Sequence, residues 1–183
     1  MSADFRTLNG LLSSTLVTPA TRQAVEARLA CFSEFTPALF TSAEFALLQA
    51  VSVQLVPHDP AAMPLARRID ARLAEGESDG WRYDALPPDA DAYRQLLTAL
   101  PADFLALGQM AQIAALTQTR QAHPLIFEEL LAELTESYYC RPEAQLGIGY
   151  VGFADAAGWT QIGLDQLDPN EALALRLSGQ DQR

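Results

Sequence analysis

Residues 40–57 read FTSAEFALLQAVSVQLVP, and this stretch decides the class of fold. Thr41 can cap a helix and Glu44 can reach back to that cap, which is the pattern of a capping box. Phe40 can pack against Phe45 as a hydrophobic staple across the same helix start. Apolar residues then recur at spacings of three and four until a proline stops the pattern. The stretch therefore predicts an amphipathic helix whose apolar face lies in the core.

Similar signals predict helices on both sides of this one. Thr18, Asp59 and Asp168 each stand directly before a proline, which is the pattern of an N-cap followed by proline at the first helical position. Gly76 is a suitable end for the helix that follows Asp59. The spacing of apolar residues predicts further helices. The predicted helices begin near residues 19, 42, 60, 89, 104, 124 and 169. Residues 76–88 are expected to form an ordered loop.

The pattern changes after residue 138. Residues 139–168 have no helical period and interleave glycines with aromatic side chains. Long segments of this kind are usually functional or disordered, and this one has too many aromatic residues for a linker. We interpret it as an arm that binds a partner through large, rigid side chains, and the alternative is that these side chains pack back onto the same chain. The candidate partner-binding residues are Tyr138, Tyr139, Tyr150, Phe153, Trp159 and Ile162.

The sequence therefore predicts an all-α fold, namely a single bundle-like domain of about six to seven helices with a long C-terminal loop rich in glycine and aromatic residues. Residues 1–39 form an N-terminal helical extension and residues 40–138 form the helical core. Residues 139–168 form the arm, and residues 169–183 form a short C-terminal helix and tail.

Composition and charge exclude several classes of protein. Of 183 residues, 49% are apolar and 19% charged, as in a folded domain with one core. The formal net charge is −11, and the arginine cluster Arg67, Arg68 and Arg72 is interpreted as a solvated helix face, so nucleic acid is not expected as a partner. No apolar run is long enough to insert into a membrane, and the start of the chain, residues 1–10, has the pattern of neither a secretory signal nor a twin-arginine signal. A soluble, cytoplasmic chain is expected as written.

No pattern of catalytic or cofactor-binding residues emerges. His58 and His123 both flank predicted helix starts, where a capping or loop role is expected rather than that of a general base. Glu129, Glu133 and Glu136 share a helix face, which is interpreted as solvated because no histidine joins them. The glycines near residue 148 do not follow a strand and form no dinucleotide fingerprint. We expect no catalytic residue, no metal ligand and no cofactor of the chain's own, and hence no enzyme.

Two stretches form a recognisable pair of motifs. In the first, a helix opens with Phe40-Thr41 and closes in Leu55-Val56-Pro57-His58-Asp59. The second comprises Leu134-Thr135, Tyr138-Tyr139, Pro142 and Gly158-Trp159-Thr160-Gln161-Ile162-Gly163. Together they resemble the small subunit, subunit 3, of gluconate 2-dehydrogenase and related flavin-dependent sugar dehydrogenases. Arg141 stands where that family usually has an aspartate.

The resemblance implies an accessory subunit without catalytic residues, which binds, stabilises or escorts a large FAD-dependent dehydrogenase for gluconate, another sugar or an alcohol. FAD would belong to the partner subunit, and a cytochrome c subunit would carry the electrons away. Members often carry a twin-arginine signal, so a periplasmic location is expected if the chain is exported with its partner. Cys31 and Cys140 are expected to be free thiols, with a disulfide as the alternative after export.

Two other functions compete with this interpretation. One is a free-standing helical binding module, in one version a homodimer that associates through the arm. The other is an enzyme that uses scattered carboxylates, which would require a polar cluster that lines a pocket.

Overall fold

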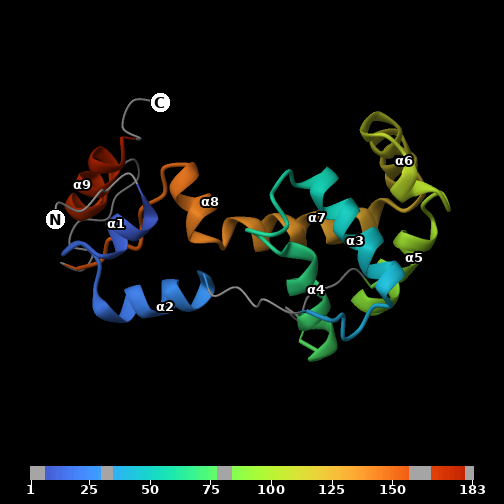
Figure 1. Ribbon diagram of the computed structural model, residues 1–183, viewed down its shortest axis with the longest axis horizontal. Helices are drawn as coiled ribbons and strands as arrows, with labels where there is room; N and C mark the ends of the chain where they lie inside the picture. Colours follow the sequence, from blue (N-terminus) through green and yellow to red (C-terminus); the bar gives the residue numbers. More distant parts are fainter. Residues whose placement is uncertain (1–6, 30–34, 78–83, 157–165, 180–183) are drawn as a thin grey trace. The chain divides into compact units, whose positions relative to one another are not determined.

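The computed structural model describes residues 7–29, 35–77, 84–156 and 166–179. Within these ranges the chain forms nine α-helices, one 3-10 helix (η1) and no β-strand, which confirms the all-α prediction (Figure 1). The chain divides into two compact units, here called unit 1 (Met1–Cys31 with Tyr139–Arg183) and unit 2 (Phe32–Tyr138). The predicted core, 40–138, lies within unit 2, whereas most of the flanking segments belong to unit 1. The sequence predicts a single domain rather than two compact units. The difference arises because no local pattern in a sequence shows that the two ends of the chain share a core.

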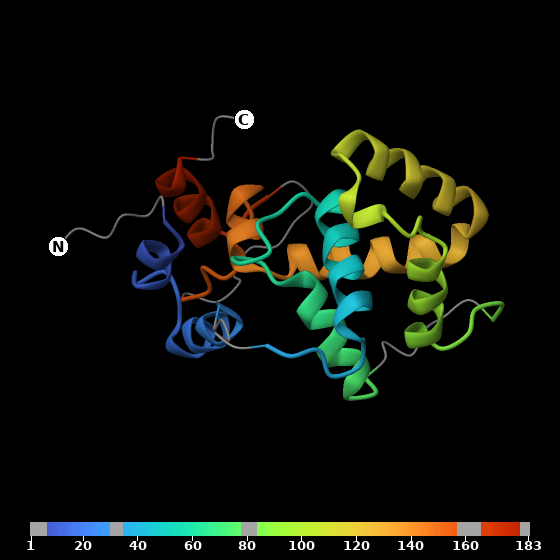
Figure 2. The same ribbon diagram turned by 45° about the vertical axis from the view of Figure 1, so that its right-hand side comes forward.

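Unit 2 is a helical body centred on α3. Its elements are α3 (Ser42–Leu55), α4 (Leu65–Ala74), α5 (Asp89–Thr98), η1 (Phe104–Ala106), α6 (Gln109–Ala122) and α7 (Pro124–Tyr139), the last residue of which belongs to unit 1. Helix α3 packs against α4, α5, η1 and α6 (Figure 2). The largest fully buried side chains of its core are Leu48, Val51, Leu65, Ile69, Leu96, Phe104, Leu130 and Leu134.

The start of α3 has the predicted capping box. The Thr41 hydroxyl accepts a hydrogen bond from the Glu44 N–H at 3.2 Å, and the Glu44 carboxylate accepts one from the Thr41 N–H at 2.8 Å. The hydrogen bond from the Thr41 N–H lowers the pKa of Glu44, and the Thr41 hydroxyl and the positive charge of Arg94 lower it further. Together these effects outweigh burial, which alone would raise the pKa. Phe40 is buried, and Phe45 packs against the same core.

The segment before α3 is fixed by a buried carboxylate. Asp70 of α4 has no exposed surface. Its two oxygens accept hydrogen bonds from the backbone N–H groups of Ala38 at 2.7 Å, Leu39 at 3.2 Å and Phe40 at 2.9 Å. One side chain thus satisfies three consecutive donors that no helix satisfies, and it ties α4 to the start of α3.

Arg72 and Glu133 do not lie on solvated helix faces, so that prediction is wrong for both. Arg72 of α4 donates to both oxygens of Glu133 of α7, at 2.7 and 2.8 Å, and also to Asp89 at 3.3 Å. The buried Tyr93 hydroxyl of α5 donates to the same Glu133 carboxylate. The hydrogen bond to Glu133 raises the pKa of Arg72. The pKa of Tyr93 is raised mainly by burial of its hydroxyl and, to a smaller extent, by the negative charge of Glu133. Three helices are therefore joined at one carboxylate.

Two helix starts differ from the prediction. Helix α4 begins at Leu65 rather than at residue 60, because Pro64 has no N–H and its ring would clash with the carbonyl four residues earlier. Asp59 instead closes a short turn, in which its side chain accepts the Ala61 N–H at 2.9 Å. The helix predicted from residue 104 is divided into η1 and α6, and Gly108 lies extended between them as the N-cap of α6.

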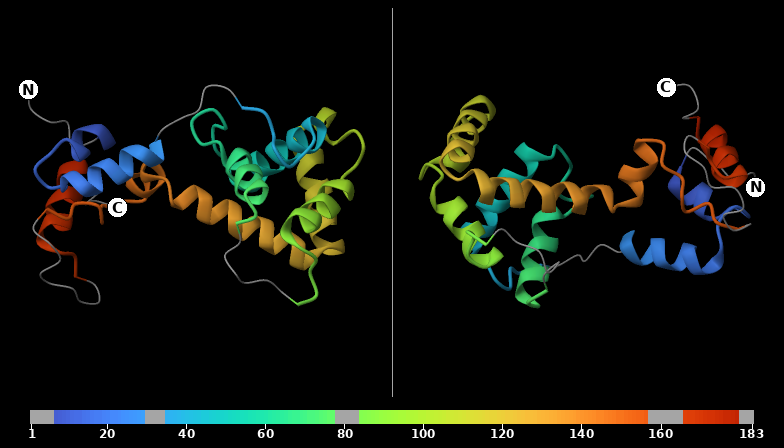
Figure 3. Two further views of the ribbon diagram at one scale, coloured as in Figure 1. Left: turned by 90° about the horizontal axis from the view of Figure 1, so that it is seen from below. Right: turned by 180° about the vertical axis from the view of Figure 1, so that it is seen from behind.

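Unit 1 is assembled from both ends of the chain. It contains α1 (Leu8–Leu12), α2 (Pro19–Leu29), α8 (Pro142–Gly147) and α9 (Pro169–Ser178), which stay together in both views of Figure 3. Helix α8 packs against α1 and α2. The hydrophobic core of unit 1 comprises Leu11, Leu12, Val17, Val25, Leu146, Val151, Phe153, Ala154 and Ala174. Helix α9 begins with the predicted cap at Asp168, to which Glu171 adds a capping box, and ends at Gly179 in the left-handed conformation.

Helices α1 and α8 were not predicted from the sequence. Helix α8 lies inside the segment that was expected to be a loop throughout, so that prediction is wrong for residues 142–147. Pro142 occupies the first turn, where the lack of an N–H costs nothing. With only six residues, α8 is too short to show a helical period, and its stability comes from burying Ala144 and Leu146.

Asp155 closes unit 1 at the start of α2. Its carboxylate accepts hydrogen bonds from the Thr18 N–H at 2.8 Å, the Thr18 hydroxyl at 2.9 Å and the Thr21 hydroxyl at 2.6 Å. Burial alone would raise the pKa of Asp155, but these bonds together with one from its own N–H outweigh burial and lower it. A carboxylate at a helix N-terminus is also favoured by the helix dipole.

Asp155→Asn is expected to destabilise unit 1 by about 1–2 kcal/mol near neutral pH, because it weakens hydrogen bonds to a charged acceptor. The folded pKa is lowered, so this contribution is fully present above the unfolded pKa of roughly 3.9 and is lost as pH falls through the folded value. Hydrogen exchange of the α2 amides from pH 7 down to pH 3 measures the effect. The difference between wild type and variant should shrink below about pH 4, and a difference that stays constant with pH would contradict this assignment.

Candidate partner-binding surface

A buried arginine lies near the start of the arm. Arg141 is 4% exposed, and its guanidinium donates to the Arg28 carbonyl oxygen near the end of α2 and to Glu143 at 3.2 Å. A positive charge beside the last carbonyls of a helix is favourable. Arg141 therefore fixes the start of α8 against α2.

The end of α8 is a Schellman motif that positions the following residues. Gly149 is in the left-handed region at φ +81°, and its N–H donates to the Leu146 carbonyl at 3.0 Å. The Tyr150 N–H donates to the Gln145 carbonyl at 2.8 Å. These are the two reverse bonds that close a helix in this motif, and glycine adopts the required conformation without strain. The glycine that resembled a loop signal in the sequence is thus a helix terminator.

The ring of Tyr150 lies against Gly152. A methyl group built on Gly152 would come within 2.2 Å of the Tyr150 hydroxyl oxygen, a distance that no pair of such atoms tolerates. The absence of a side chain at residue 152 therefore allows the tyrosine ring to occupy this position. Before α8, the Gln145 side-chain amide donates to the Tyr139 carbonyl oxygen at 2.9 Å. Gln145 thus binds the backbone of Tyr139 through its side chain and that of Tyr150 through its own carbonyl oxygen.

Three large apolar or aromatic side chains remain exposed around this helix. Ile148 is 63% exposed, Tyr150 47% and Tyr139 44%. We call these three residues the arm surface. Exposed aromatic and aliphatic side chains on a backbone held by hydrogen bonds are the anchors that protein interfaces use, because little conformational entropy is lost on binding. Ile148 was not among the predicted residues, and recognising Pro142 to Gly149 as a capped helix would have placed it beyond the last turn.

The other predicted partner-binding residues have different positions. Phe153 is 7% exposed and lies in the core of unit 1, so it follows the alternative in which the arm packs on its own chain and is not available to a partner. Tyr138 is half-buried and packs against the core of unit 2. Trp159 and Ile162 lie outside the described residues. Of the six candidates, Tyr139 and Tyr150 therefore belong to the arm surface.

The histidines lie in connecting segments, as expected. The His58 Nδ1 is 2.5 Å from the Val56 carbonyl oxygen in the segment between α3 and α4. His123 is the C-cap of α6, and its N–H donates to the Thr119 carbonyl at 2.9 Å. Among the described residues, no group of three or more His, Cys, Asp or Glu side chains is arranged to hold a metal ion. Cys31 lies outside the described residues, so the state of Cys31 and Cys140 stays a prediction.

Within the part of the chain that the structure describes, no helix combines the length and apolar character required to cross a membrane. Comparisons of the chain with protein families, with curated proteins and with solved structures found no match.

Proposed function

We propose that this protein is a non-catalytic accessory subunit that binds and stabilises a large FAD-dependent dehydrogenase acting on gluconate, another sugar or an alcohol. The observation that carries the proposal is the arm surface, where Tyr139, Ile148 and Tyr150 are exposed beside α8. Tyr139 and Pro142, the first residue of α8, both belong to the motif that resembles subunit 3 of gluconate 2-dehydrogenase. FAD belongs to the partner, and a cytochrome c subunit is the proposed electron acceptor of the complex.

The geometry of the arm surface supports a binding role rather than a flexible tail. Its backbone is held by the Schellman motif at Gly149, so Ile148 and Tyr150 are presented in one arrangement before a partner arrives. Covering the exposed half of each side chain is expected to contribute about 1–1.5 kcal/mol. Together the two residues account for about 2–3 kcal/mol, or roughly a 30- to 150-fold change in affinity.

The test is co-purification. The tagged chain is expressed in its native host, the complex is isolated, and its visible spectrum is recorded together with the identity of the bound proteins. A flavin band and a large dehydrogenase are expected for the wild type. The double variant Ile148→Ser, Tyr150→Ser is expected to bind the purified flavoprotein about 30- to 150-fold more weakly, because two apolar anchors are lost.

Leu177→Ser is the matched control, since Leu177 is 39% exposed on α9 of the same unit. It should bind as the wild type does, and circular dichroism should show that all variants remain helical. A wild-type chain that purifies colourless and alone would exclude the accessory role and favour a free-standing binding module. Equal weakening by the control would show that unit 1 had lost its fold rather than its contact.

A further inference from the structure

His58 has a buried ring nitrogen that lacks a donor. Its Nδ1 lies 2.5 Å from the Val56 carbonyl oxygen, a contact that assigns the ring proton to Nδ1. The Nε2 atom of the neutral ring then carries a lone pair and can only accept a hydrogen bond. Nε2 is buried, and among the described residues none donates to it. Buried acceptors in native proteins are nearly always satisfied by protein or by water, so a donor for Nε2 is expected.

His58 also lines a small cavity. The cavity has a volume of about 20 Å³ and lies between α3, the start of α4 and the segment that joins the two helices. One water molecule needs roughly 10–15 Å³, so the space suits a single molecule of that size and excludes larger ligands. Polar side chains on the wall belong to Gln49 and Ser52 of α3, to His58 and to Arg67 of α4. The cavity is therefore small enough for water and also polar.

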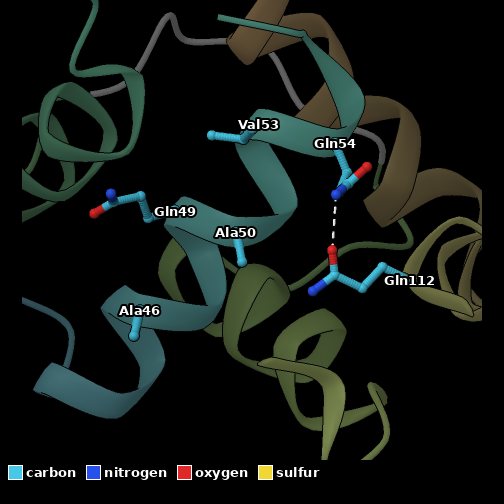
Figure 4. A pocket seen from close by; sticks show the side chains of 6 residues that line it. All are labelled: Ala46, Gln49, Ala50, Val53, Gln54 and Gln112. Atoms are coloured by element: carbon cyan, nitrogen blue, oxygen red, sulfur yellow. Dashed lines mark hydrogen bonds between the residues drawn. The ribbon is translucent and has the colours of Figure 1, made fainter. Parts of the chain in front are cut away.

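The polar groups on the wall include a second acceptor and a donor. Ser52 has no exposed surface, and its hydroxyl donates to the Gln49 carbonyl at 2.8 Å, which leaves the hydroxyl oxygen free to accept. The Gln49 side-chain amide can donate. Figure 4 shows α3 from the side of a larger hollow, of about 400 Å³, where Gln49 points away from the hydrogen bond between Gln54 and Gln112. That pair therefore does not use the Gln49 amide.

The chemistry of the wall selects the ligand. A lone pair on Nε2 binds either a hydrogen-bond donor or a metal ion. Metal ions take several nitrogen, sulfur or carboxylate ligands, and among the described residues that line the cavity there is no carboxylate and no thiol. Arg67 adds a positive charge to the same wall, which disfavours a cation. The ligand is thus neutral, of one heavy atom, and able to donate to two acceptors while it accepts in turn.

We propose that one ordered water molecule binds in this cavity, donates to His58 Nε2 and to the Ser52 hydroxyl oxygen, and accepts from the Gln49 amide. A buried water typically makes about three hydrogen bonds and is costly to remove. This water joins α3 to the segment before α4, in which Pro60 and Pro64 have no N–H of their own to donate. It thereby stabilises the connection between the two helices.

Two measurements on the wild-type chain test the site directly. A high-resolution crystal structure should show one water within hydrogen-bond distance of His58 Nε2 and of the Ser52 hydroxyl. Nitrogen-15 spectra of the imidazole should show the tautomer that is protonated on Nδ1, and the His58 ring protons should give a cross-peak to a long-lived water. A protein donor at Nε2, or a tautomer protonated on Nε2, would overturn the proposal.

A substitution that fills the cavity gives a further readout. Ser52→Val removes the hydroxyl and places methyl groups in the space, so the number of long-lived waters measured by oxygen-17 relaxation dispersion should fall by about one. Thr119→Val is the matched control, because Thr119 is a buried hydroxyl that donates to the Ala115 carbonyl within α6 and does not line this cavity. Its water count should equal that of the wild type, and circular dichroism should show both variants helical.

The remaining outcomes are equally decisive. An unchanged water count in a folded Ser52→Val variant would overturn the site. Zinc ions titrated into the wild type should leave the His58 ring signals unchanged, and a saturable shift would instead assign the cavity to a metal ion. If Ser52→Val fails to fold, the wild-type crystal structure and spectra decide alone. None of these measurements involves the flavoprotein, so their result is separate from that of the proposed function.

Discussion

Replacing Asp70 by alanine is expected to lower the free energy of unfolding by about 3–5 kcal/mol. The substitution removes the acceptor for three backbone N–H groups, those of Ala38, Leu39 and Phe40. Each buried donor that loses its partner costs about 1–3 kcal/mol, and the three losses are not fully additive because the segment can relax. Since Asp70 itself has no exposed surface, water does not readily replace the carboxylate.

Urea unfolding followed by circular dichroism measures this loss, and hydrogen exchange locates it in α3 and α4. Asp70→Asn keeps one acceptor oxygen and is expected to lose about half as much. Glu75→Ala is the control, because Glu75 is an exposed acidic residue at the end of the same helix. A loss below about 1 kcal/mol for Asp70→Ala would mean that the three N–H groups find other partners.

Replacing Glu133 by alanine is the second large effect, with an expected loss of about 2–3 kcal/mol. Removing one member of a largely buried ion pair leaves the other charge poorly compensated, and here Arg72 keeps its weaker contact to Asp89 and its hydrogen bond to the Glu77 carbonyl oxygen. The buried hydroxyl of Tyr93 loses its acceptor at the same time. The value lies below the roughly 3–5 kcal/mol of fully buried pairs because the side chains of Arg72 and Glu133 are 26% and 15% exposed, so water partly solvates the charge that remains.

The matched variant is Glu136→Ala, which removes an exposed carboxylate from the same helix and is expected to change stability by less than about 0.5 kcal/mol. Arg72→Met and the double variant with Glu133→Ala complete a cycle that isolates the pairwise energy. If Glu133→Ala and Glu136→Ala lowered the free energy of unfolding by the same amount, the junction of Arg72, Tyr93 and Glu133 would stabilise the fold no more than an exposed carboxylate does.

The starts of the helices could be predicted where the signal is local. Thr41 and Glu44 are three residues apart, and Asp168 stands directly before a proline, so each cap is readable within one turn of sequence. Pro64 was an equally local signal, and giving it the weight it carries would have placed the start of α4 correctly.

The features that depend on distant residues could not be predicted in this way. Glu133 and Glu136 look alike on the sequence of α7, and what distinguishes them is Arg72, 61 residues away from Glu133. The same applies to the arm, where the exposed Tyr150 and the buried Phe153 differ only through the core of unit 1. That core is supplied from both ends of the chain, and no pattern within residues 139–168 contains it.

The construction of unit 1 from both ends of the chain has a consequence during synthesis. Asp155 is 137 residues beyond Thr18, its hydrogen-bond partner. At the usual rate of about 5–20 residues per second, the ribosome needs roughly 7–27 s to make that span. Throughout this interval α1 and α2 have emerged without the residues that cover them, whereas unit 2 draws its contacts from the intervening chain and can fold first. The apolar side chains of Leu11 and Val25 are therefore exposed on the nascent chain during this interval, and we expect cellular chaperones to bind that segment.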